Sequence, residues 1–425
     1  MSGEVLQAHA GEPNSHSVPA APAADPAAGR ALRCKGWVLQ RPVSSWSLSA
    51  AAATYSSEVV VPVPGPGQVR VKVYAAAVNP LDVKRATLGR TGGGLFRRGS
   101  SSSGGATSTR RPPPEFPFPY VMGVDGAGVV ESVGWSSDDV QQQQYYGLQV
   151  GDRVAFLADM VKEDGGSFCQ YAVVPADAVG KLPPPTPSDV IDFVEAAALP
   201  CATGTAYVAL FDKLCVEAGR SIFINGASGG VGSAAVQLAK CAGLCVLASC
   251  STVNASYVQE LGADYVFDYT AVDVVDACLA YTQGFGVDYV LEVADAATAL
   301  QHADALRFGG AICVVPGHMP ASSEALFRRQ ISVSYVSLGG LHDHPLTRGN
   351  LRRVVENTLG LYQSGAFRLQ LETVPLERAG AAFDFIALGH TRGKIVLTDF
   401  HPNESPGGDE VIGTRRRRQA KKQKQ

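Results

Sequence analysis

The alternation of apolar and amphipathic segments over residues 200–340 constrains the fold of this chain more than any other feature. Apolar segments that fit buried strands lie at 221–225, 244–248, 265–267, 288–293, 311–315 and 331–336. Helical patterns separate most of them, at 230–242, 254–261, 272–282 and 296–308. Continuous apolar strands separated by helices are typical of a parallel sheet that is covered on both faces. The sequence therefore predicts a doubly wound α/β domain over residues 200–340.

Residues 32–182 have a different character, with short alternating segments and many Gly and Pro turns. Val69, Val71 and Val73 alternate with polar residues, and similar short segments recur between residues 120 and 182. This pattern favours a small antiparallel barrel or sandwich. Within this region we predict a polar loop at the Gln run 141–144 and a long mobile loop, rich in Gly, Ser and Pro, at 88–119. Beyond the α/β domain, helices are predicted at 351–364 and 376–388, the second between two short strands.

Three glycines at a spacing of three residues lie between the strand at 221–225 and the helix that follows it. Backbone without side chains can approach a pyrophosphate closely, and a helix N-terminus offers free N–H donors and a partial positive charge. The preceding strand and the following helix supply the context that this motif requires. We therefore expect a dinucleotide here, with a purely structural turn as the alternative. The expected contacts are Gly226, Ala227, Ser228, Gly229, Gly230, Val231 and Gly232.

The residues after the second strand indicate which dinucleotide binds. An acidic side chain there would bind the ribose 2′-hydroxyl of NAD and repel the 2′-phosphate of NADP. The strand at 244–248 is followed by small uncharged residues, among them Ser249 and Ser251, and no carboxylate occurs before Glu260. Hydroxyl groups can donate to a phosphate, so we predict NADPH, with these two serines near its 2′-phosphate. No Arg or Lys lies nearby in the sequence, so a cationic partner would have to come from elsewhere in the chain.

The charge balance and the cysteines limit the partners. The chain carries 36 Lys and Arg against 39 Asp and Glu, and the basic residues include a run near the C-terminus. A mildly acidic body argues against nucleic acid as the main ligand. No apolar run approaches the ~20 residues that cross a bilayer, and the N-terminus resembles no secretory signal. The nine scattered cysteines are typical of a reduced compartment, so we expect a cytoplasmic protein that binds neither nucleic acid nor membrane.

Several short motifs occur in the order that one enzyme superfamily shows. They are GQVRVKV, VNPLDVK, YVMGVDGAGVVESVG, VGDRVAF, GSFCQYAVVP, AALPCATGTAY, NGASGGVG, LGADYVFDY and GHTRGKIVL. In this order they resemble the medium-chain dehydrogenase/reductase superfamily, and most of all its zinc-free quinone oxidoreductase-like branch. The resemblance covers nearly all of residues 32–400.

The resemblance implies a GroES-like β-barrel domain and a Rossmann domain, with the active site in the cleft between them. It also implies a homodimer in which the strand at 331–336 extends the sheet across a two-fold axis. The domain boundaries expected on this basis are a disordered tail at 1–30, the GroES-like catalytic domain at 31–199, the Rossmann domain at 200–340, a return to the catalytic domain at 341–400 and a basic disordered tail at 401–425.

Zinc-dependent relatives in this superfamily hold a catalytic metal with a Cys, a His and a second Cys. At the matching positions this chain has Asn79, Val124 and Cys201, so only one of the three ligands is present. A catalytic zinc needs three protein ligands, and residues 88–119 contain none of the cysteines of the structural zinc lobe. We therefore expect no metal. This expectation extends to three closely spaced cysteines and to two histidines interpreted as polar loop residues: Cys241, Cys245, Cys250, His342 and His344.

The resemblance also implies roles for individual side chains. Without a metal, hydrogen-bond donors must stabilise the negative charge that develops on the substrate oxygen. The Asn79 amide is the candidate donor, although Asn79 equally fits the N-cap of a helix that starts at Pro80. Thr205 matches a threonine near the nicotinamide, and Lys84 either lies near the cleft or is solvated. Two more residues match positions near the cofactor: Tyr269, with packing at the edge of the core as the alternative, and Lys394, with a surface lysine as the alternative. Val293 and Gly317 are expected as backbone contacts, because they lie at the carboxyl ends of predicted strands.

These features predict an NADPH-dependent, zinc-free oxidoreductase that transfers hydride to a small electrophile, a quinone or an α,β-unsaturated carbonyl. Two alternatives stay open. Enoyl-thioester reduction would need a basic pocket for the carrier's phosphates, for which Arg97, Arg98, Arg110 and Arg111 are candidates. A non-catalytic NADPH-binding scaffold would use its tails and long loop to engage partners. The basic C-terminal run fits a solvated tail, a nuclear signal or a phosphate-attracting arm.

Overall fold

The computed structural model describes residues 32–41, 53–88, 118–159, 166–185, 190–319, 324–389 and 391–402. From Arg33 onward the chain forms one unit. The expected tails at 1–30 and 401–425 and the expected loop at 88–119 lie outside the described residues, apart from a few residues at their edges.

The predicted parallel sheet is present and contains six strands in the order β11-β10-β9-β12-β13-β14. All five neighbouring pairs are parallel. The strands are β9 (Ser221–Asn225), β10 (Cys245–Cys250), β11 (Tyr265–Asp268), β12 (Val287–Glu292), β13 (Leu306–Val314) and β14 (Ser332–Tyr335). The order reverses at β9, because β10 follows it on one side and β12 lies on the other. In open α/β sheets, ligands bind outside the carboxyl ends of the strands at such a reversal.

Both faces of the central strands β9 and β10 are buried, which explains why these strands are largely apolar. In β9, Ile222 and Ile224 enter one core together with Leu238 of helix α5 (Gly230–Cys241). Phe223 points to the opposite face and joins a second core with Val275 of helix α7 (Val274–Tyr281). The other helices of this part of the chain are α6 (Ala255–Glu260), α8 (Ala299–His302) and α9 (Glu324–Arg328), with short 3₁₀ turns η4 (Thr252–Asn254), η5 (Ala303–Ala305) and η6 (Gly339–Asp343).

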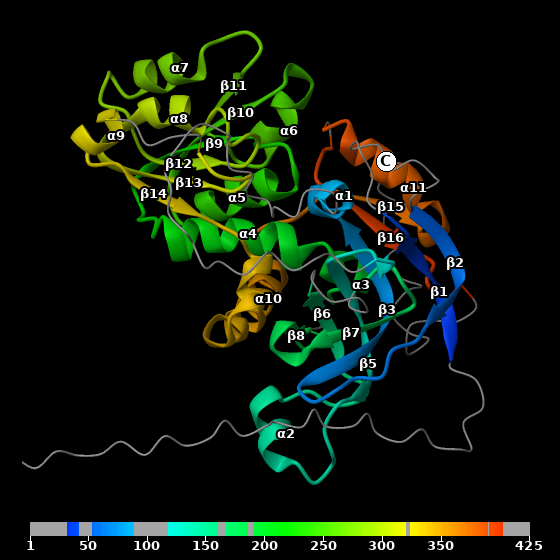
Figure 1. Ribbon diagram of the computed structural model, residues 1–425. Helices are drawn as coiled ribbons and strands as arrows, with labels where there is room; N and C mark the ends of the chain where they lie inside the picture. Colours follow the sequence, from blue (N-terminus) through cyan, green and yellow to red (C-terminus); the bar gives the residue numbers. More distant parts are fainter. Residues whose placement is uncertain are drawn as a thin grey trace, which may run out of the picture. The chain divides into compact units, whose positions relative to one another are not determined.

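The remaining strands form two sheets beside the parallel one (Figure 1). One contains seven strands in the order β15-β16-β3-β5-β6-β8, with β7 also paired to β3, and the other has the order β2-β1-β4. All their neighbouring pairs are antiparallel except β15 with β16. The strands are β1 (Arg33–Leu39), β2 (Ala53–Val60), β3 (Gln68–Val78), β4 (Tyr120–Val121), β5 (Asp125–Val133), β6 (Arg153–Leu157), β7 (Tyr171–Pro175), β8 (Val179–Lys181), β15 (Leu371–Pro375) and β16 (Lys394–Thr398).

The alternation expected in this region is seen in β3, where Val69, Val71 and Val73 are fully buried. They belong to a core that also contains Phe156 and Phe383. The helices around these sheets are α1 (Pro80–Leu88), α2 (Val140–Tyr146), α3 (Phe193–Ala197), α10 (Pro345–Gln363) and α11 (Ala379–Ala387), with turns η1 (Ala176–Ala178) and η7 (Leu376–Arg378).

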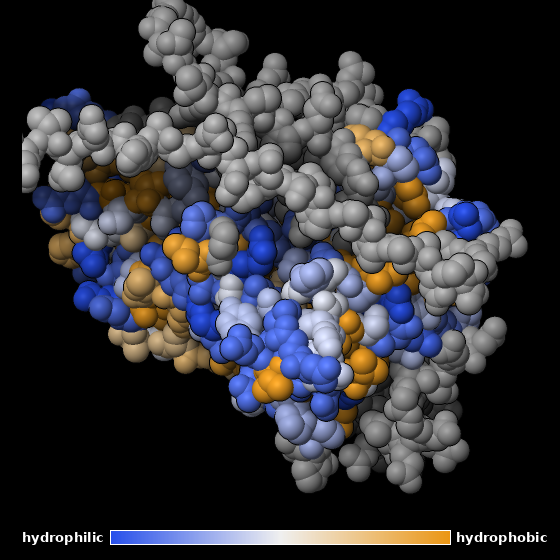
Figure 2. Space-filling view, turned by 60° about the horizontal axis from the view of Figure 1, so that its bottom comes forward, coloured by the Kyte–Doolittle hydropathy of each residue, from blue (hydrophilic) through white to orange (hydrophobic). Residues whose placement is uncertain are grey.

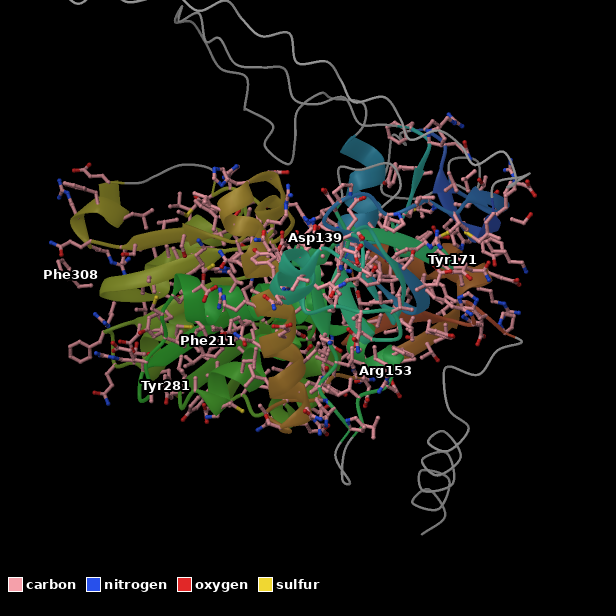
Figure 3. The ribbon with its side chains drawn as sticks, turned by 90° about the horizontal axis from the view of Figure 1, so that it is seen from below. Asp139, Arg153, Tyr171, Phe211, Tyr281 and Phe308 are labelled. Atoms are coloured by element: carbon pink, nitrogen blue, oxygen red, sulfur yellow. The ribbon has the colours of Figure 1, made fainter. Side chains whose placement is uncertain are left out.

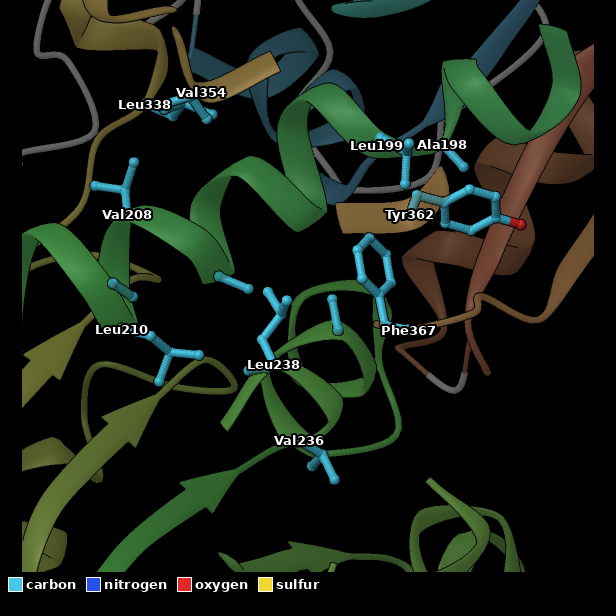
Figure 4. Packing of buried hydrophobic residues seen from close by; sticks show 14 of the residues in the cluster. Ala198, Leu199, Val208, Leu210, Val236, Leu238, Leu338, Val354, Tyr362 and Phe367 are labelled. Atoms are coloured by element: carbon cyan, nitrogen blue, oxygen red, sulfur yellow. The ribbon is translucent and has the colours of Figure 1, made fainter. Parts of the chain in front are cut away.

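The Ala-rich segment before β9 is helical, as its sequence predicts. It continues from α3 through η2 (Leu199–Thr203), α4 (Gly204–Tyr207) and η3 (Val208–Lys213), of which η2 and η3 have π-helical bonding. Figure 4 shows Leu199 and Leu238 on this core, with Tyr362 and Phe367 from α10 and the residues after it packed alongside. Elements that are far apart in the sequence therefore share one core.

Two expectations about individual elements are wrong. The predicted polar loop at 141–144 is helix α2, because Asp139 caps its first turn by accepting from the backbone N–H of Gln142 and Gly147 ends it in the left-handed conformation. The helix predicted at 296–308 is limited to α8 and the turn η5 that follows it, and β13 already starts at Leu306. Gly309 and Gly310 lie inside that strand, where they interrupt the apolar pattern.

No helix in the described ranges is long and apolar enough to cross a membrane. On the face drawn in Figure 2, apolar residues are interspersed among hydrophilic ones.

Candidate active site

The glycine turn follows β9 and leads directly into α5, at the point where the strand order reverses. Gly226 has φ +82°, a conformation that side chains rarely adopt. A Cβ atom on Gly232 would lie 2.2 Å from the carbonyl oxygen of Gly226, so only glycine lets the helix start this close to the strand. A Cβ atom on Gly229 would meet only Gly226 O, at 3.7 Å, so there is open space beside Gly229, immediately before α5. The turn therefore fits a pyrophosphate at a helix N-terminus.

The loop after β12 lies against this turn. A Cβ atom on Gly226 would be 3.0 Å from Ala294 Cβ and 3.3 Å from Val293 Cγ2. Gly317, after β13, lies near Ala296, at 3.6 Å from an added Cβ atom to Ala296 Cβ. Val293 thus lies beside the glycine turn, and Gly317 follows the neighbouring strand β13 and lies near Ala296 of the same loop.

Beyond the end of β10, a cluster of polar side chains surrounds Asn254. Its amide donates to the hydroxyl oxygens of Ser228 and Ser251, at 3.2 and 3.3 Å. Arg392, which lies 138 residues later in the sequence, donates from Nε to Asn254 Oδ1 at 3.0 Å and from a terminal nitrogen to the carbonyl of Val253 at 2.8 Å. A guanidinium group is therefore held beside the residues that the sequence analysis expects near a 2′-phosphate.

Two residues expected in that region differ in accessibility. Ser249 is fully buried and donates its hydroxyl proton to Asn225 Oδ1 at 2.6 Å, so its side chain points into the protein and not toward a ligand. Tyr269 is 53% exposed at the end of β11, and its ring is accessible. The sequence did not indicate that the Ser249 side chain points inward, because both faces of the buried strand β10 are apolar.

A buried polar network lies on the other side of the glycine turn. Lys394 Nζ donates to Asn79 Oδ1 at 2.6 Å and to the carbonyl of Val78 at 3.1 Å, and it lies 3.6 Å from Asp125 Oδ2. The Asn79 amide donates to Asp125 Oδ2 at 2.8 Å and to the carbonyl of Ala77 at 3.2 Å. The backbone N–H of Cys201 donates to the other Asp125 oxygen at 2.7 Å. Asp125 thereby joins β5, the end of β3 and η2.

Lys394 connects this network to the glycine turn. A Cβ atom on Gly230 would lie 2.9 Å from Lys394 Cδ, so the stem of the lysine packs against the start of α5. The neighbouring Gly393 N–H donates to the carbonyl of Ser228 at 3.1 Å. The lysine matched from the sequence to the cofactor side of the cleft thus lies between the glycine turn and Asn79.

Burial raises the pKa of Asp125 to about 6, against the opposing effects of the Lys394 charge and of hydrogen bonds from Asn79 and Cys201. The Asp125 side chain has no exposed surface and Lys394 is 3% exposed. At neutral pH the carboxylate is ionised and faces a buried ammonium group. The two charges compensate each other within the protein.

The chain matches two family models. Residues 65–184 match the alcohol dehydrogenase GroES-like domain, and residues 261–397 match the family described as zinc-binding dehydrogenase. Quinone oxidoreductase of Homo sapiens is 33% identical over 260 residues, which cover 61% of this chain and 67% of that protein. The chloroplastic NADPH-dependent alkenal/one oxidoreductase of Arabidopsis thaliana is 30% identical over 343 residues, 80% of this chain and 74% of that one.

The chain belongs to the medium-chain dehydrogenase/reductase superfamily, in its quinone oxidoreductase-like branch. The fold agrees: the crystal structure of a quinone oxidoreductase from Pseudomonas syringae pv. tomato DC3000 gives a TM-score of 0.69 at 24% identity, covering 86% of this chain and all of that one. The expected GroES-like and Rossmann architecture is confirmed. The residue boundaries drawn from the sequence for each domain stay predictions.

The name of one matched family raises the question of zinc, which can be tested on the donor groups. At the three matching positions Asn79 offers an amide that already bonds Lys394 and Asp125, Val124 offers no donor, and only Cys201 carries a thiol. The nearest charge to Asn79 Oδ1 is the Lys394 ammonium group. These residues do not fit a catalytic zinc site. Within the ranges that the structure describes, no group of three His, Cys, Asp or Glu side chains could hold a metal ion.

The other residues that the sequence analysis weighed as ligands serve local roles. Cys241 Sγ bonds the carbonyl of Ala366, and Cys245 Sγ bonds the hydroxyl of Tyr281, so these thiols face different partners. His344 caps α10 by accepting from the backbone N–H of Leu346. His342 lies in a turn, as expected, but it is only 2% exposed, and burial lowers its pKa.

Sequence reasoning missed the contacts of three residues in this site, namely Arg392, Asp125 and Glu292. Arg392 bonds Asn254, 138 residues away in the sequence, and Asp125 bonds Cys201, 76 residues away. No local sequence pattern indicates such contacts. Glu292, at the end of β12, is fully buried and accepts from the Asn225 amide and from the backbone N–H groups of Ala294 and Asp295. It fixes the loop that lies against Gly226. A carboxylate that ends an apolar strand is the one signal that could have indicated it.

Two further residues that were expected near the site are Thr205 and Lys84. Thr205 is 6% exposed on α4, and its hydroxyl makes no hydrogen bond to another described residue. Lys84 of α1 is partly buried, and burial lowers the pKa of its amine while Asp295 opposes that shift. Lys84 and Asp295 are therefore close enough to interact electrostatically, so α1 lies opposite the loop after β12.

Proposed function

We propose that this protein is an NADPH-dependent, zinc-independent oxidoreductase that reduces quinones or α,β-unsaturated carbonyl compounds. The glycine turn and the buried lysine network beside it carry this proposal: a site for a dinucleotide adjoins a polar site whose cation is an amino group instead of a metal. The named activities of the human and Arabidopsis thaliana relatives support the substrate class. When bound, the nicotinamide supplies a hydride.

The position of Arg392 supports NADPH over NADH. Its guanidinium group is held by Asn254 beside Ser228 and Ser251, and an Arg near this position accommodates a 2′-phosphate in dinucleotide-binding folds. The carboxylate of Asp268 ends the next strand, β11, and accepts from the hydroxyls of Thr252 and Thr270. A carboxylate that selects NAD would instead follow β10.

Arg392→Gln tests this preference. A charged hydrogen bond is worth roughly 1.5–3 kcal/mol, so we expect the Kd for NADPH to rise by about tenfold or more while the Kd for NADH stays unchanged. Fluorescence titration of both nucleotides measures the effect. Arg353→Gln is the matched control, because Arg353 pairs with Asp212 on an exposed surface. Equal losses for the two nucleotides would contradict the assignment.

Thr205 is the best available donor to the bound substrate or nicotinamide. Its hydroxyl is uncommitted in the described structure, whereas both N–H groups of the Asn79 amide are donated to protein oxygens. We propose that Thr205 makes the direct contact and that Asn79 orients the site together with Lys394. Thr205→Val should lower kcat by about 10–100-fold, as the loss of one preorganised donor does, with little change in the Kd for NADPH. Thr205→Ser should restore most of the activity.

A panel of acceptors tests the activity itself. NADPH oxidation is followed with a quinone, an α,β-unsaturated ketone and an enoyl thioester, each with and without a zinc chelator. The proposal predicts turnover of a quinone or the ketone that the chelator leaves unchanged. Turnover of the thioester alone would identify the enoyl reductase alternative. Tight NADPH binding without turnover of any acceptor would identify the scaffold alternative.

We also propose a homodimer in the cytoplasm. The edge strand β14 leaves Val333 and Tyr335 exposed by 36% and 40%, and an unpaired edge is a template for pairing with a second copy. All nine cysteines are free thiols, as in a reducing compartment. Size-exclusion chromatography with light scattering tests the dimer: Val333→Glu should shift the chain to the monomer, and a monomeric wild type would contradict it.

A further inference from the structure

Two thiols from distant parts of the chain meet outside the cleft. Cys34 lies on β1 and Cys169 lies two residues before β7, 135 residues later, and their sulfur atoms are 3.3 Å apart. They are 4% and 1% exposed, respectively, and pack with Val61 in a small apolar cluster. Both are free thiols. Tyr171, which packs on this cluster, lies close to β1 in Figure 3.

The backbone holds the two cysteines in this position. Gly36 and Cys169 form an antiparallel bridge, and on either side Trp37 N–H donates to the carbonyl of Phe168 at 2.8 Å and Gln170 N–H to that of Lys35 at 3.0 Å. The segment with Cys169 is therefore an additional short strand paired to β1. The paired backbone therefore keeps the two sulfur atoms facing each other at 3.3 Å.

Gly36 gives the Cys169 side chain its room. A Cβ atom at Gly36 would lie 2.8 Å from Cys169 Sγ and 2.9 Å from its Cβ, closer than real side chains pack. Because β1 has no side chain there, Cys169 can lie across the strand and reach Cys34. The contact thus depends on Cys34, Gly36 and Cys169, and none of them has a proposed role in binding a cofactor or substrate.

The surroundings make the two thiols unequal. The hydrogen bond with Cys169 and a backbone contact at Tyr171 lower the pKa of Cys34, and the same hydrogen bond and burial raise the pKa of Cys169. The thiolate is the nucleophile in thiol oxidation. Cys34 is also the more exposed of the two, at 4% against 1%, so we expect its sulfur to react first and Cys169 to resolve the product.

We propose that Cys34 and Cys169 form a peroxide-responsive thiol pair, a modification site separate from the dinucleotide cleft. The Cys34 thiolate attacks one oxygen of hydrogen peroxide, the O–O bond breaks, and the departing hydroxide takes the thiol proton as water, which leaves a sulfenic acid. The Cys169 sulfur then attacks Cys34 sulfur, the S–O bond breaks and a second water leaves. Both thiols are oxidised to one disulfide, and one peroxide is reduced to two waters.

The disulfide would fix β1 to the segment at 167–169, which is hydrogen-bonded to the residues just before β5. Ser167 N–H donates to the carbonyl of Gly123 at 3.0 Å and Phe168 N–H to that of Met122 at 2.8 Å, immediately before β5. A cross-link that closes a loop of 135 residues restricts the unfolded chain strongly. We therefore expect oxidation to raise the Tm by several degrees, and a reductant to reverse the rise.

Peptide mapping of the full chain tests the pair. The folded protein is treated with hydrogen peroxide, its remaining thiols are alkylated, and the digest is searched for linked peptides. We expect a Cys34–Cys169 peptide, a loss of two of the nine thiols and recovery of both with dithiothreitol. Protein denatured before oxidation should give a mixture of pairs instead.

Variants distinguish oxidation of the proposed pair from nonspecific oxidation of other thiols. Cys34→Ala and Cys169→Ala should each abolish the linked peptide and the Tm rise, whereas Cys215→Ala, at an exposed cysteine, should leave both unchanged. Gly36→Ala should lower the yield of the linked peptide. The proposal is overturned if folded wild-type protein keeps Cys34 and Cys169 as thiols, or oxidises them to sulfinic acid, under peroxide that modifies Cys215.

Discussion

At the scale of single residues, the protonation state of Asp125 affects how the stability of the folded chain depends on pH. Its pKa of about 6 in the folded chain lies above its ordinary value of 3.8, because burial disfavours the carboxylate. The group therefore contributes stability that is present below pH 3.8 and is lost as the pH rises through 6. One pKa unit corresponds to 1.36 kcal/mol, so ionising this buried carboxylate costs about 3 kcal/mol of folding free energy at neutral pH.

Lys394→Met removes the cation that holds this pKa down. The pKa of Asp125 should rise further, so the pH-dependent loss of stability should extend above pH 7. We expect the variant to be less stable than wild type by about 3 kcal/mol at pH 8, the cost of leaving a buried charge unpaired, and by much less at pH 5. Urea unfolding at the two pH values measures the difference.

The double variant Asp125→Asn with Lys394→Met is the control for this prediction. It removes both charges, so it should recover most of the lost stability and show no extra pH dependence between 5 and 8. A double variant as unstable as Lys394→Met alone would show that the lysine stabilises the fold by its hydrogen bonds to Val78 and Asn79 instead of by its pairing with Asp125.

At the scale of elements, the glycine turn couples β9 to the start of α5. A methyl group at Gly232 would lie 2.2 Å from Gly226 O, which belongs to the backbone and cannot move aside cheaply. The turn would have to open, which would displace the N–H groups at the start of the helix.

Gly232→Ala should therefore weaken binding of both NADPH and NADH by more than about tenfold, since it removes main-chain contacts common to both. Fluorescence titration measures this loss, and circular dichroism checks that the variant is folded. Gly360→Ala is the matched control: a Cβ atom there meets nothing within 4 Å in helix α10, so it should stabilise the chain by about 0.5–1 kcal/mol and leave binding unchanged. Unchanged binding in Gly232→Ala would contradict the cofactor site.

The sequence predicted elements better than it predicted contacts. The parallel sheet followed from continuous apolar strands, and the glycine turn followed from its spacing. Helix α2 was missed because its stability comes from Asp139 and Gly147 at its ends and not from a buried face, so its residues show no apolar period. The early start of β13 was missed because two glycines interrupt its apolar pattern.

At the scale of the whole molecule, β16 and the two residues before it connect the Rossmann and GroES-like parts of the site. Residues 392–394 contact Asn254 and Ser228 of the Rossmann fold, and Lys394 contacts Asn79 of the GroES-like fold. These contacts join segments that are up to 315 residues apart in the sequence. A single sequence carries no signal for such pairs, which explains why Arg392 and the partners of Lys394 could not be predicted.

A ligand that binds at this junction should stabilise the unit as a whole. At 100 times its Kd, a ligand specific for the native state contributes about 2.7 kcal/mol. We expect NADPH to raise the Tm in a single cooperative transition, and NADH at the same concentration to raise it less. Differential scanning calorimetry measures both shifts. Two separate transitions, with only one shifted, would show that residues 392–394 do not couple the two folds.

The central claim is that a phosphorylated dinucleotide binds at the glycine turn without help from a metal ion. The most direct measurement is a fluorescence titration of the purified chain with NADPH and with NADH, in the presence of a zinc chelator and with the metal content determined on the same sample. We expect saturable binding of one dinucleotide per chain, tighter for NADPH, in protein that contains no stoichiometric zinc. Failure to bind either nucleotide, or binding that disappears with the chelator, would contradict it.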